Sequence, residues 1–122
     1  MSAGSDRVER AIEVLSSTGM PKGTARTLAF LSSKGDWTTS KEIEQATSLR
    51  QPEVSIAVRN LLDRGWVMRD SLKRDSKGRP INIYRMNTDL TEVYRSIEIE
   101  EMEKIAEVEE NLAQIKKLWG VK

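Results

Sequence analysis

The sequence of 122 residues contains no cysteine and no histidine. Without these residues the chain forms no disulfide, no cysteine–histidine zinc site and no thiolate or imidazole catalytic group. The two absences exclude most common enzyme mechanisms, as well as thiol and soft-metal signalling. We therefore expect a protein that is not an enzyme, with no catalytic residues, no metal site and no cofactor.

Long apolar runs are also missing. No segment approaches the roughly 18 consecutive apolar residues of a membrane span, and the charged N-terminal segment is followed by no apolar stretch. Hydrophobic residues make up 38% of the chain and charged residues 32%, which is typical of a soluble domain with a modest core. We expect a cytoplasmic protein without a membrane partner.

Charge is divided unevenly along the chain, although the net charge is only +1. Residues 1–49 are balanced, residues 50–88 carry a net charge of +5, and residues 89–122 carry −4. A division of this kind indicates a middle segment that meets a polyanion and a C-terminal segment that stays away from it.

Apolar periodicity and turn residues predict five helices and one hairpin. Helices are expected over residues 5–17 and 21–34, from a Thr39–Glu42 capping box to about Ala46, over 50–63, and over some thirty residues after Asp89. Between the second and third helices there is room for only a short extended piece. Two segments rich in β-forming residues, 66–73 and 81–86, flank a polar turn and predict a hairpin.

This element order, with its residues, resembles the DNA-binding core of MarR-like, ArsR-like and archaeal TrmB-like transcription regulators. The resemblance covers roughly residues 20–88. It is carried by residues 39–55, by the helix exit Leu61-Leu62-Asp63-Arg64-Gly65-Trp66-Val67, and by Lys77-Gly78-Arg79-Pro80 followed by Ile83-Tyr84-Arg85. It implies a mainly α fold with a small β-hairpin wing: a winged helix-turn-helix domain (residues 1–88) and a long C-terminal helix (89–122). It also implies transcription control.

The helix over residues 50–63 supplies the candidate base-reading face. If Val54, Ala57, Val58, Leu61 and Leu62 point inward, a period of 3.6 residues turns another set outward. The outward set is Gln51, Pro52, Ser55, Ile56 and Arg59. Gln pairs bidentately with adenine, Arg pairs with guanine, and Ser reaches base edges or phosphate, while Pro and Ile contact thymine methyl groups. Gln51 and Arg59 are the strongest candidates, the alternative being a merely solvated face.

Two further groups are candidates for phosphate contacts. The hairpin tip carries four cations, namely Lys73, Arg74, Lys77 and Arg79, which suit phosphate or minor-groove contacts. The alternative is that such charges protect sheet edges from aggregation. Ser40 and Lys41 begin the preceding helix, where exposed amides bind phosphate or serve only in capping.

The few aromatic residues are dispersed over several elements. Phe30, Trp37, Trp66 and Tyr84 are therefore expected to pack in the core or at the sheet edge rather than to stack on bases. Without an aromatic cluster, duplex DNA is favoured over single-stranded RNA.

The C-terminal segment shows the spacing of a coiled-coil seam. Apolar residues follow one another at intervals of 3, 4, 3 and 4, and the earlier Tyr94 belongs to the same expected dimer interface. The seam consists of Ile105, Val108, Leu112, Ile115 and Trp119. Continued backward, the register meets Glu101 and Glu98 and breaks near residues 97–102. The alternative is a helix that packs on its own domain.

Together these observations predict a homodimeric regulator, a repressor by default, that places two recognition helices in successive major grooves of a near-palindromic operator. Two alternatives remain at this stage. One is a winged-helix protein-interaction module, and the other is a general or architectural factor that binds DNA without strong sequence preference.

Overall fold

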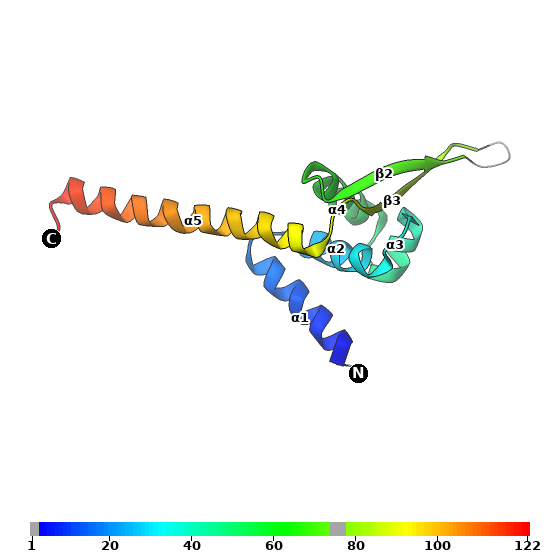
Figure 1. Ribbon diagram of the computed structural model, residues 1–122, viewed down its shortest axis with the longest axis horizontal. Helices are drawn as coiled ribbons and strands as arrows, with labels where there is room; N and C mark the ends of the chain where they lie inside the picture. The colour runs from blue at the N-terminus through cyan, green and yellow to red at the C-terminus, as the bar shows by residue number, and fades with distance from the viewer. Residues whose placement is uncertain (1–2, 74–77) are drawn as a thin grey trace. The chain divides into compact units, whose positions relative to one another are not determined.

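The computed structural model describes residues 3–73 and 78–122. These residues form two compact units, 1–89 and 90–122, which are coloured from blue to yellow-green and from yellow to red in Figure 1. The first unit contains α1 (Ala3–Ser17), α2 (Lys22–Lys34), β1 (Thr38–Thr39), α3 (Ser40–Thr47), α4 (Gln51–Asp63), β2 (Val67–Leu72) and β3 (Ile81–Met86), and the second contains α5 (Leu90–Trp119). The predicted mainly helical fold with a small β wing is confirmed.

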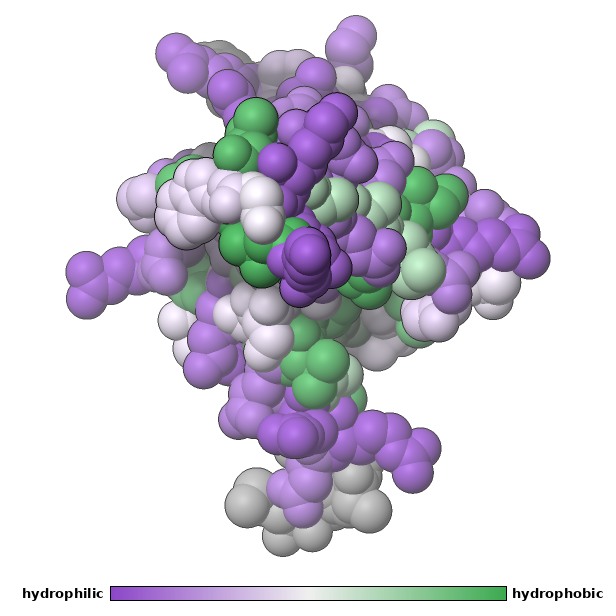
Figure 2. Space-filling view, turned by 90° about the vertical axis from the view of Figure 1, so that its left-hand side faces the viewer, coloured by the Kyte–Doolittle hydropathy of each residue, from purple (hydrophilic) through white to green (hydrophobic). Residues whose placement is uncertain are grey.

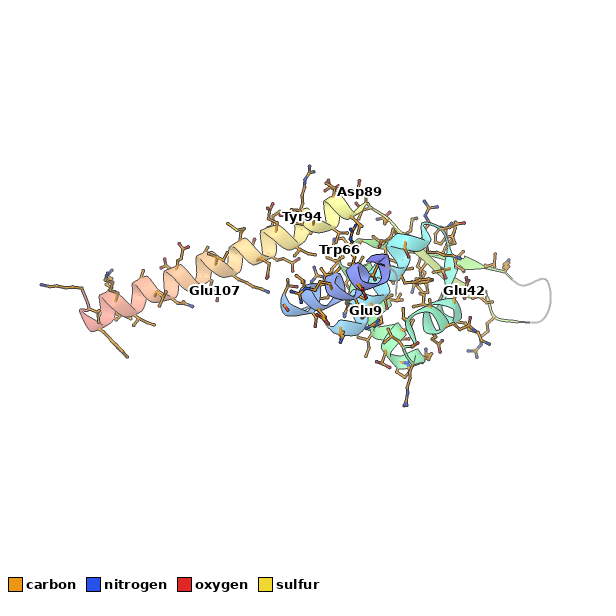
Figure 3. The ribbon with its side chains drawn as sticks, turned by 90° about the horizontal axis from the view of Figure 1, so that it is seen from below. Glu9, Glu42, Trp66, Asp89, Tyr94 and Glu107 are labelled. Atoms are coloured by element: carbon orange, nitrogen blue, oxygen red, sulfur yellow. The ribbon has the colours of Figure 1, made fainter. Side chains whose placement is uncertain are left out.

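Helix α1 packs against α2 through a narrow row of side chains. Ile12 is buried and Leu15 is half-buried, whereas Val8 and Ala11 are exposed although the periodicity predicts them on the same apolar stripe. An ion pair adds to the contact, since Arg26 Nη1 donates to Glu9 Oε1 at 2.8 Å. This hydrogen bond lowers the pKa of Glu9 (labelled in Figure 3) and raises that of Arg26.

The core of the first unit lies between α2 and α4. Leu28 and Leu31 of α2 and Val54 and Leu61 of α4 are almost completely buried, as the spacing of the apolar residues predicts. A polar link accompanies this packing, because Asn60 Nδ2 donates to the buried Thr24 Oγ1 at 3.0 Å. Leu62, which the sequence also assigns to the inner face, is only half-buried.

Helix α3 begins at the predicted capping box. The Glu42 amide donates to Thr39 Oγ1 at 3.1 Å, and the Thr39 amide donates to Glu42 Oε1 at 3.2 Å. The backbone hydrogen bond, together with the positive charge of Lys34, lowers the pKa of Glu42. Helix α3 ends at Ser48, whose φ of 61° is left-handed, so the chain turns sharply into α4.

The sheet is antiparallel with the strand order β1-β3-β2. Thr38 lies opposite Tyr84 in β3, which in turn lies opposite Arg69 in β2. Strand β2 begins at Val67 rather than at Trp66, because the Trp66 amide closes the end of α4 by donating to the Leu61 carbonyl at 3.2 Å. The preceding Gly65 has a φ of 77°, which a residue without a side chain adopts easily.

The second unit is a single helix of 30 residues, α5. Every residue from Met102 to Lys122 is exposed, and side chains project from all sides of this helix in Figure 3. The space-filling view shows green apolar patches set among purple hydrophilic side chains (Figure 2). No helix within residues 3–73 and 78–122 is long and apolar enough to cross a membrane.

Candidate nucleic-acid interface

The outer face of α4 consists of the side chains that the helical period turns away from the core. All five are exposed, and Ile56 exposes 60% of its surface. They are Gln51, Pro52, Ser55, Ile56 and Arg59. The predicted separation of an inner apolar face from an outer polar face is therefore confirmed, whereas base contacts by these residues remain a prediction.

The first turn of α4 is fixed by its own side chains. The Arg50 amide donates to Glu53 Oε1 at 3.0 Å, and Gln51 Nε2 donates to Ser55 Oγ at 3.1 Å. The second bond holds the Gln51 amide over the outer face, one turn before Ser55. Gln51 and Ser55 therefore present a joint set of donors and acceptors at the N-terminal end of the helix, where recognition helices contact bases.

An open groove of about 740 Å³ runs beside this face, between α4, the first residue of α3 and the sheet. Ser55, Ile56 and Arg59 line it from α4, Ser40 from α3, and Arg69 and Tyr84 from the sheet. Asn60 and Asp63 also line the groove, so it contains one carboxylate beside its two guanidinium groups. The groove is therefore open and its lining is largely polar.

Arg69 is the residue of this groove that sequence reasoning missed. It lies opposite the buried Tyr84 in the antiparallel register, and residues paired in this way share one face of a sheet. The guanidinium therefore belongs to the face next to α4 rather than to the outer face. The alternation of side chains along residues 66–73 carries this signal, but only once the partner strand and its register are known.

The remaining predicted DNA contacts lie at the far end of the hairpin and at the start of α3. Lys73 follows β2, Arg79 precedes β3, and both are exposed. Lys41 is exposed beside the half-buried Ser40 at the start of α3. Arg74 and Lys77, the other two predicted wing contacts, lie outside the described residues.

Several cations of the first unit already have neighbours of their own. The guanidinium of Arg64 lies 4.5 Å from the centre of the Trp66 ring, and that of Arg85 lies 5.4 Å from the centre of the Trp37 ring. Within the described residues, by contrast, neither Arg59 nor Arg69 forms an ion pair. The guanidinium groups of these two groove arginines are therefore not committed to an acidic side chain of the described residues.

The aromatic residues of the first unit do not form a stacking platform. Trp66 (labelled in Figure 3) and Tyr84 are buried, and Phe30 and Trp37 are half-buried. Their predicted packing role is confirmed. Base stacking of the kind used for single-stranded nucleic acid requires exposed rings, which these four residues do not provide.

The predicted dimer residues form an exposed stripe on α5. Each of them exposes between 48% and 80% of its surface. They are Tyr94, Ile105, Val108, Leu112, Ile115 and Trp119. Tyr94 (labelled in Figure 3) also donates its hydroxyl to Glu98 Oε2 at 3.2 Å, within the same helix. Pairing of this stripe with a second copy remains a prediction.

Other kinds of site find little support in the described parts of the chain. No group of three or more acidic side chains there is arranged to hold a metal ion. A hollow of about 230 Å³ lies among residues of α1, α2 and α3, with the Glu9–Arg26 ion pair among its lining residues. Because those two charges neutralise each other, the hollow offers no free charged group to a ligand.

Comparison with known proteins agrees with this geometry. A family model described as the MarR family matches residues 18–78, which is half of the chain. No curated protein matches the chain. The matched segment contains α2, α3, α4 and β2, that is, the core, the helix-turn-helix and the first strand of the wing.

Solved structures share the fold at low sequence identity. A protein described as a possible transcriptional regulator from Methanosarcina mazei Go1 is 17% identical, with a TM-score of 0.61 over 93% of this chain and 87% of the other. S. aureus MepR in its DNA-binding conformation is 22% identical, with a TM-score of 0.54 over 96% and 88%. A variant of MepR bound to an oligodeoxyribonucleotide is 20% identical, with a TM-score of 0.55 over 95% and 90%.

The first of these neighbours is described as a possible transcriptional regulator, and the two MepR structures are described as DNA-bound or in a DNA-binding conformation. The family model covers all of α4 and every residue that lines the groove except Tyr84. The chain therefore belongs to the MarR family of winged-helix transcription regulators.

Proposed function

We propose that the protein is a homodimeric transcription regulator that binds double-stranded DNA in a sequence-specific manner and acts as a repressor. Residues 1–88 form its DNA-binding domain and residues 89–122 its dimerisation helix. The observation that carries the proposal is the outer face of α4, where Gln51, Ser55 and Arg59 are exposed along a groove that also contains Arg69.

In the proposed complex α4 enters the major groove. Gln51 and Arg59 contact base edges, Ser55 contacts a base edge or phosphate, and Pro52 and Ile56 contact thymine methyl groups. A structural neighbour supports this role for the fold, since a MepR variant has been solved with an oligodeoxyribonucleotide. The α4 face then supplies sequence choice, and the surrounding cations supply affinity.

Phosphate contacts come from both sides of α4. Lys73, Arg74, Lys77 and Arg79 of the wing lie along the backbone or the minor groove, and Ser40 and Lys41 contact phosphate near the start of α3. Such contacts fix the position of the protein on the duplex and make affinity depend on salt. The acidic residues 89–122, with a net charge of −4, stay away from the phosphates.

Two copies joined through α5 give the complex a two-fold axis. A symmetric dimer reads an inverted repeat, so the operator is near-palindromic, and its half-sites are separated by one helical turn, about 34 Å, or a multiple of it. A repressor of this kind works by occupying a promoter. We also propose that the protein acts in the cytoplasm, on the nucleoid.

The test is a fluorescence-anisotropy titration on a mixed-sequence duplex at several salt concentrations. Wild type is compared with Lys73→Ala/Arg79→Ala, and a matched control, Arg7→Ala/Arg10→Ala, removes the same charge from exposed positions of α1. We expect the wing variant to bind more weakly and to lower the log–log salt slope by about 2 per protomer, and the control to change neither.

Three results would contradict the proposal. Equal losses of affinity in the wing variant and in the control would show that binding depends only on the total positive charge of the protein. Absence of binding at low salt would favour the alternative of a protein-interaction module, whose partner would be sought among proteins. Binding without any preference among duplex sequences would indicate a general or architectural factor instead.

A further inference from the structure

The apolar stripe of α5 has no partner along the C-terminal half of the helix. Ile105 and Val108 lie in a shallow hollow of about 310 Å³ that is lined from this helix alone, with Glu101, Lys104 and Glu109 at its edges. Residues at i, i+3, i+4 and i+7 on one helix form the hole that receives a side chain from a facing helix. Ile105, Val108, Glu109 and Leu112 have this spacing.

The residue types along the seam bear on the direction of the facing helix. In heptad terms Ile105, Leu112 and Trp119 take the a positions, and Val108 and Ile115 take the d positions. Parallel two-stranded coiled coils favour β-branched residues at a and leucine at d. Here both d positions are β-branched and leucine is at a, so the pattern disfavours a parallel pair.

The distribution of charge along α5 also disfavours a parallel pair. Residues 98–110 contain seven acidic residues and one lysine, whereas residues 111–122 contain three lysines and no acidic residue. A parallel pair would place the two acidic segments side by side. An antiparallel pair brings the basic end of each helix toward the acidic segment of the other, which lowers the repulsion.

We propose that two copies of this chain pair through antiparallel α5 helices, with Leu112 against Ile115 of the partner copy and Val108 against Trp119 of the partner copy. This inference rests on the homodimer of the proposed function and adds its direction and register. In this register Glu109 lies beside Lys116 of the partner copy, and the two-fold axis repeats the pair.

A competing ion pair of the parallel arrangement is already weakened within one copy. In a parallel pair the flanking Lys104 would reach toward Glu109 of the partner. However, Lys104 Nζ lies 2.7 Å from Glu101 Oε2 of its own helix. To reach Glu109 of the partner copy, Lys104 would have to give up its ion pair with Glu101, which offsets part of the energy gained. The contact therefore gives the parallel arrangement little advantage.

The area available is sufficient for a specific contact. The five seam residues expose 49%, 56%, 61%, 48% and 80% of their surfaces, in chain order. Their burial would remove on the order of 600 Å² per copy from water, or about 1,200 Å² in all, which is the lower end of stable protein interfaces.

The two directions predict different distances between equivalent residues. With a rise of 1.5 Å per residue, the proposed register separates the two copies of residue 100 by roughly 40 Å along the helix axis and the two copies of residue 117 by about 10 Å. A parallel pair holds both positions at the same depth, within roughly 20 Å of their counterparts. Position 100 therefore discriminates, and position 117 serves as the control.

Distance measurement between spin labels tests this directly, because the chain has no native cysteine. Glu100→Cys and Lys117→Cys are labelled separately in the full-length protein. A short distance at 117 together with a distance of roughly 40 Å at 100 supports the antiparallel pair. Short distances at both positions would overturn the antiparallel direction while leaving the homodimer intact. A protein that stays monomeric in sedimentation and shows no dipolar coupling would refute both.

A charge exchange tests the register. Glu109→Lys and Lys116→Glu should each weaken association about 3- to 10-fold, and the double variant Glu109→Lys/Lys116→Glu should restore it to within about 2-fold of wild type. A double variant that associates no better than the single variants would contradict the proposed neighbours. In a parallel pair the two positions lie one heptad apart, about two helical turns, and do not compensate.

Discussion

Apolar residues of the same types are buried in the first unit of this chain and exposed in the second. In residues 1–89, Leu31, Ile43 and Leu61 are fully buried, and the charged residues lie around a groove. In residues 90–122, Leu112 and Trp119 expose 61% and 80% of their surfaces. The first unit therefore carries its own core, whereas in the proposed account the second unit buries its apolar stripe only against a second molecule.

Charge separates the two units as clearly as burial does. The segment that contains α4 and the wing has a net charge of +5, and the segment that contains α5 has −4. In the proposed account a polyanion meets the first and is repelled by the second. In that account, DNA binding and self-association use two surfaces of opposite charge within one short chain.

The largest effect should come from the core of the first unit. Leu61→Ala removes a side chain with no exposed surface and should lower the free energy of unfolding by about 2–5 kcal/mol. Urea denaturation followed by circular dichroism measures it. Leu112→Ala, the matched change on α5, should leave the unfolding of the first unit within about 0.5 kcal/mol of wild type. Equal losses in both variants would remove the distinction between the units.

The next effect concerns association. Leu112→Glu places a charge in the middle of the proposed seam and should weaken dimerisation by roughly 100-fold, because a buried unpaired carboxylate is costly. Sedimentation at several concentrations gives the dissociation constant. Glu103→Gln, an exposed position outside the seam, is the control. An unchanged dimer in Leu112→Glu would show that the copies meet elsewhere.

A smaller effect is expected at the groove. Arg59→Ala should cost about 1–3 kcal/mol of binding to the preferred duplex and should relax sequence choice at one position. Arg69→Ala should instead weaken binding to all duplexes alike, because a phosphate contact carries no sequence information. Competition with single-base variants of the preferred duplex separates the two. If both variants lose the same specificity, Arg59 and Arg69 do not have the different roles proposed here.

The smallest effect is a dependence of stability on pH at the start of α3. The Thr39 amide hydrogen bond, helped by Lys34, holds the pKa of Glu42 below its ordinary value. As the pH falls, the unfolded chain therefore binds the proton before the folded chain does. The contribution of Glu42 to stability is complete above the pKa of the unfolded state and is lost as the pH falls through the pKa of the folded state.

Glu42→Gln isolates this contribution, because glutamine also completes a capping box but does not titrate. Between about pH 6 and pH 3, the stability of wild type should fall more than that of the variant, as measured by urea denaturation. Parallel curves would show that Glu42 does not supply the difference.

Much of the fold could be predicted from the sequence, because the signals were local. The Thr39–Glu42 box and the period of α4 each depend on residues within four positions of one another, and the structure confirms both. Non-local features were harder to predict. Arg69 joined the groove only through its register with Tyr84, and Val8 is exposed because α1 meets α2 along a narrow row.

The candidate site divides in the same way. Exposure of Gln51 and Arg59 follows from helical periodicity alone, whereas the groove beside them depends on how β2 and β3 pair. Base contacts and the facing helix of α5 depend on molecules outside the chain. No single sequence specifies those partners by spacing or charge alone.

The most direct test of the account is selection of bound duplexes from a random library by the full-length protein, followed by sequencing and determination of the stoichiometry on the enriched site. The account predicts an enriched near-palindromic sequence occupied by two copies of the protein. A bound pool that is indistinguishable from the starting library, or an enriched site that holds a single copy, would contradict it.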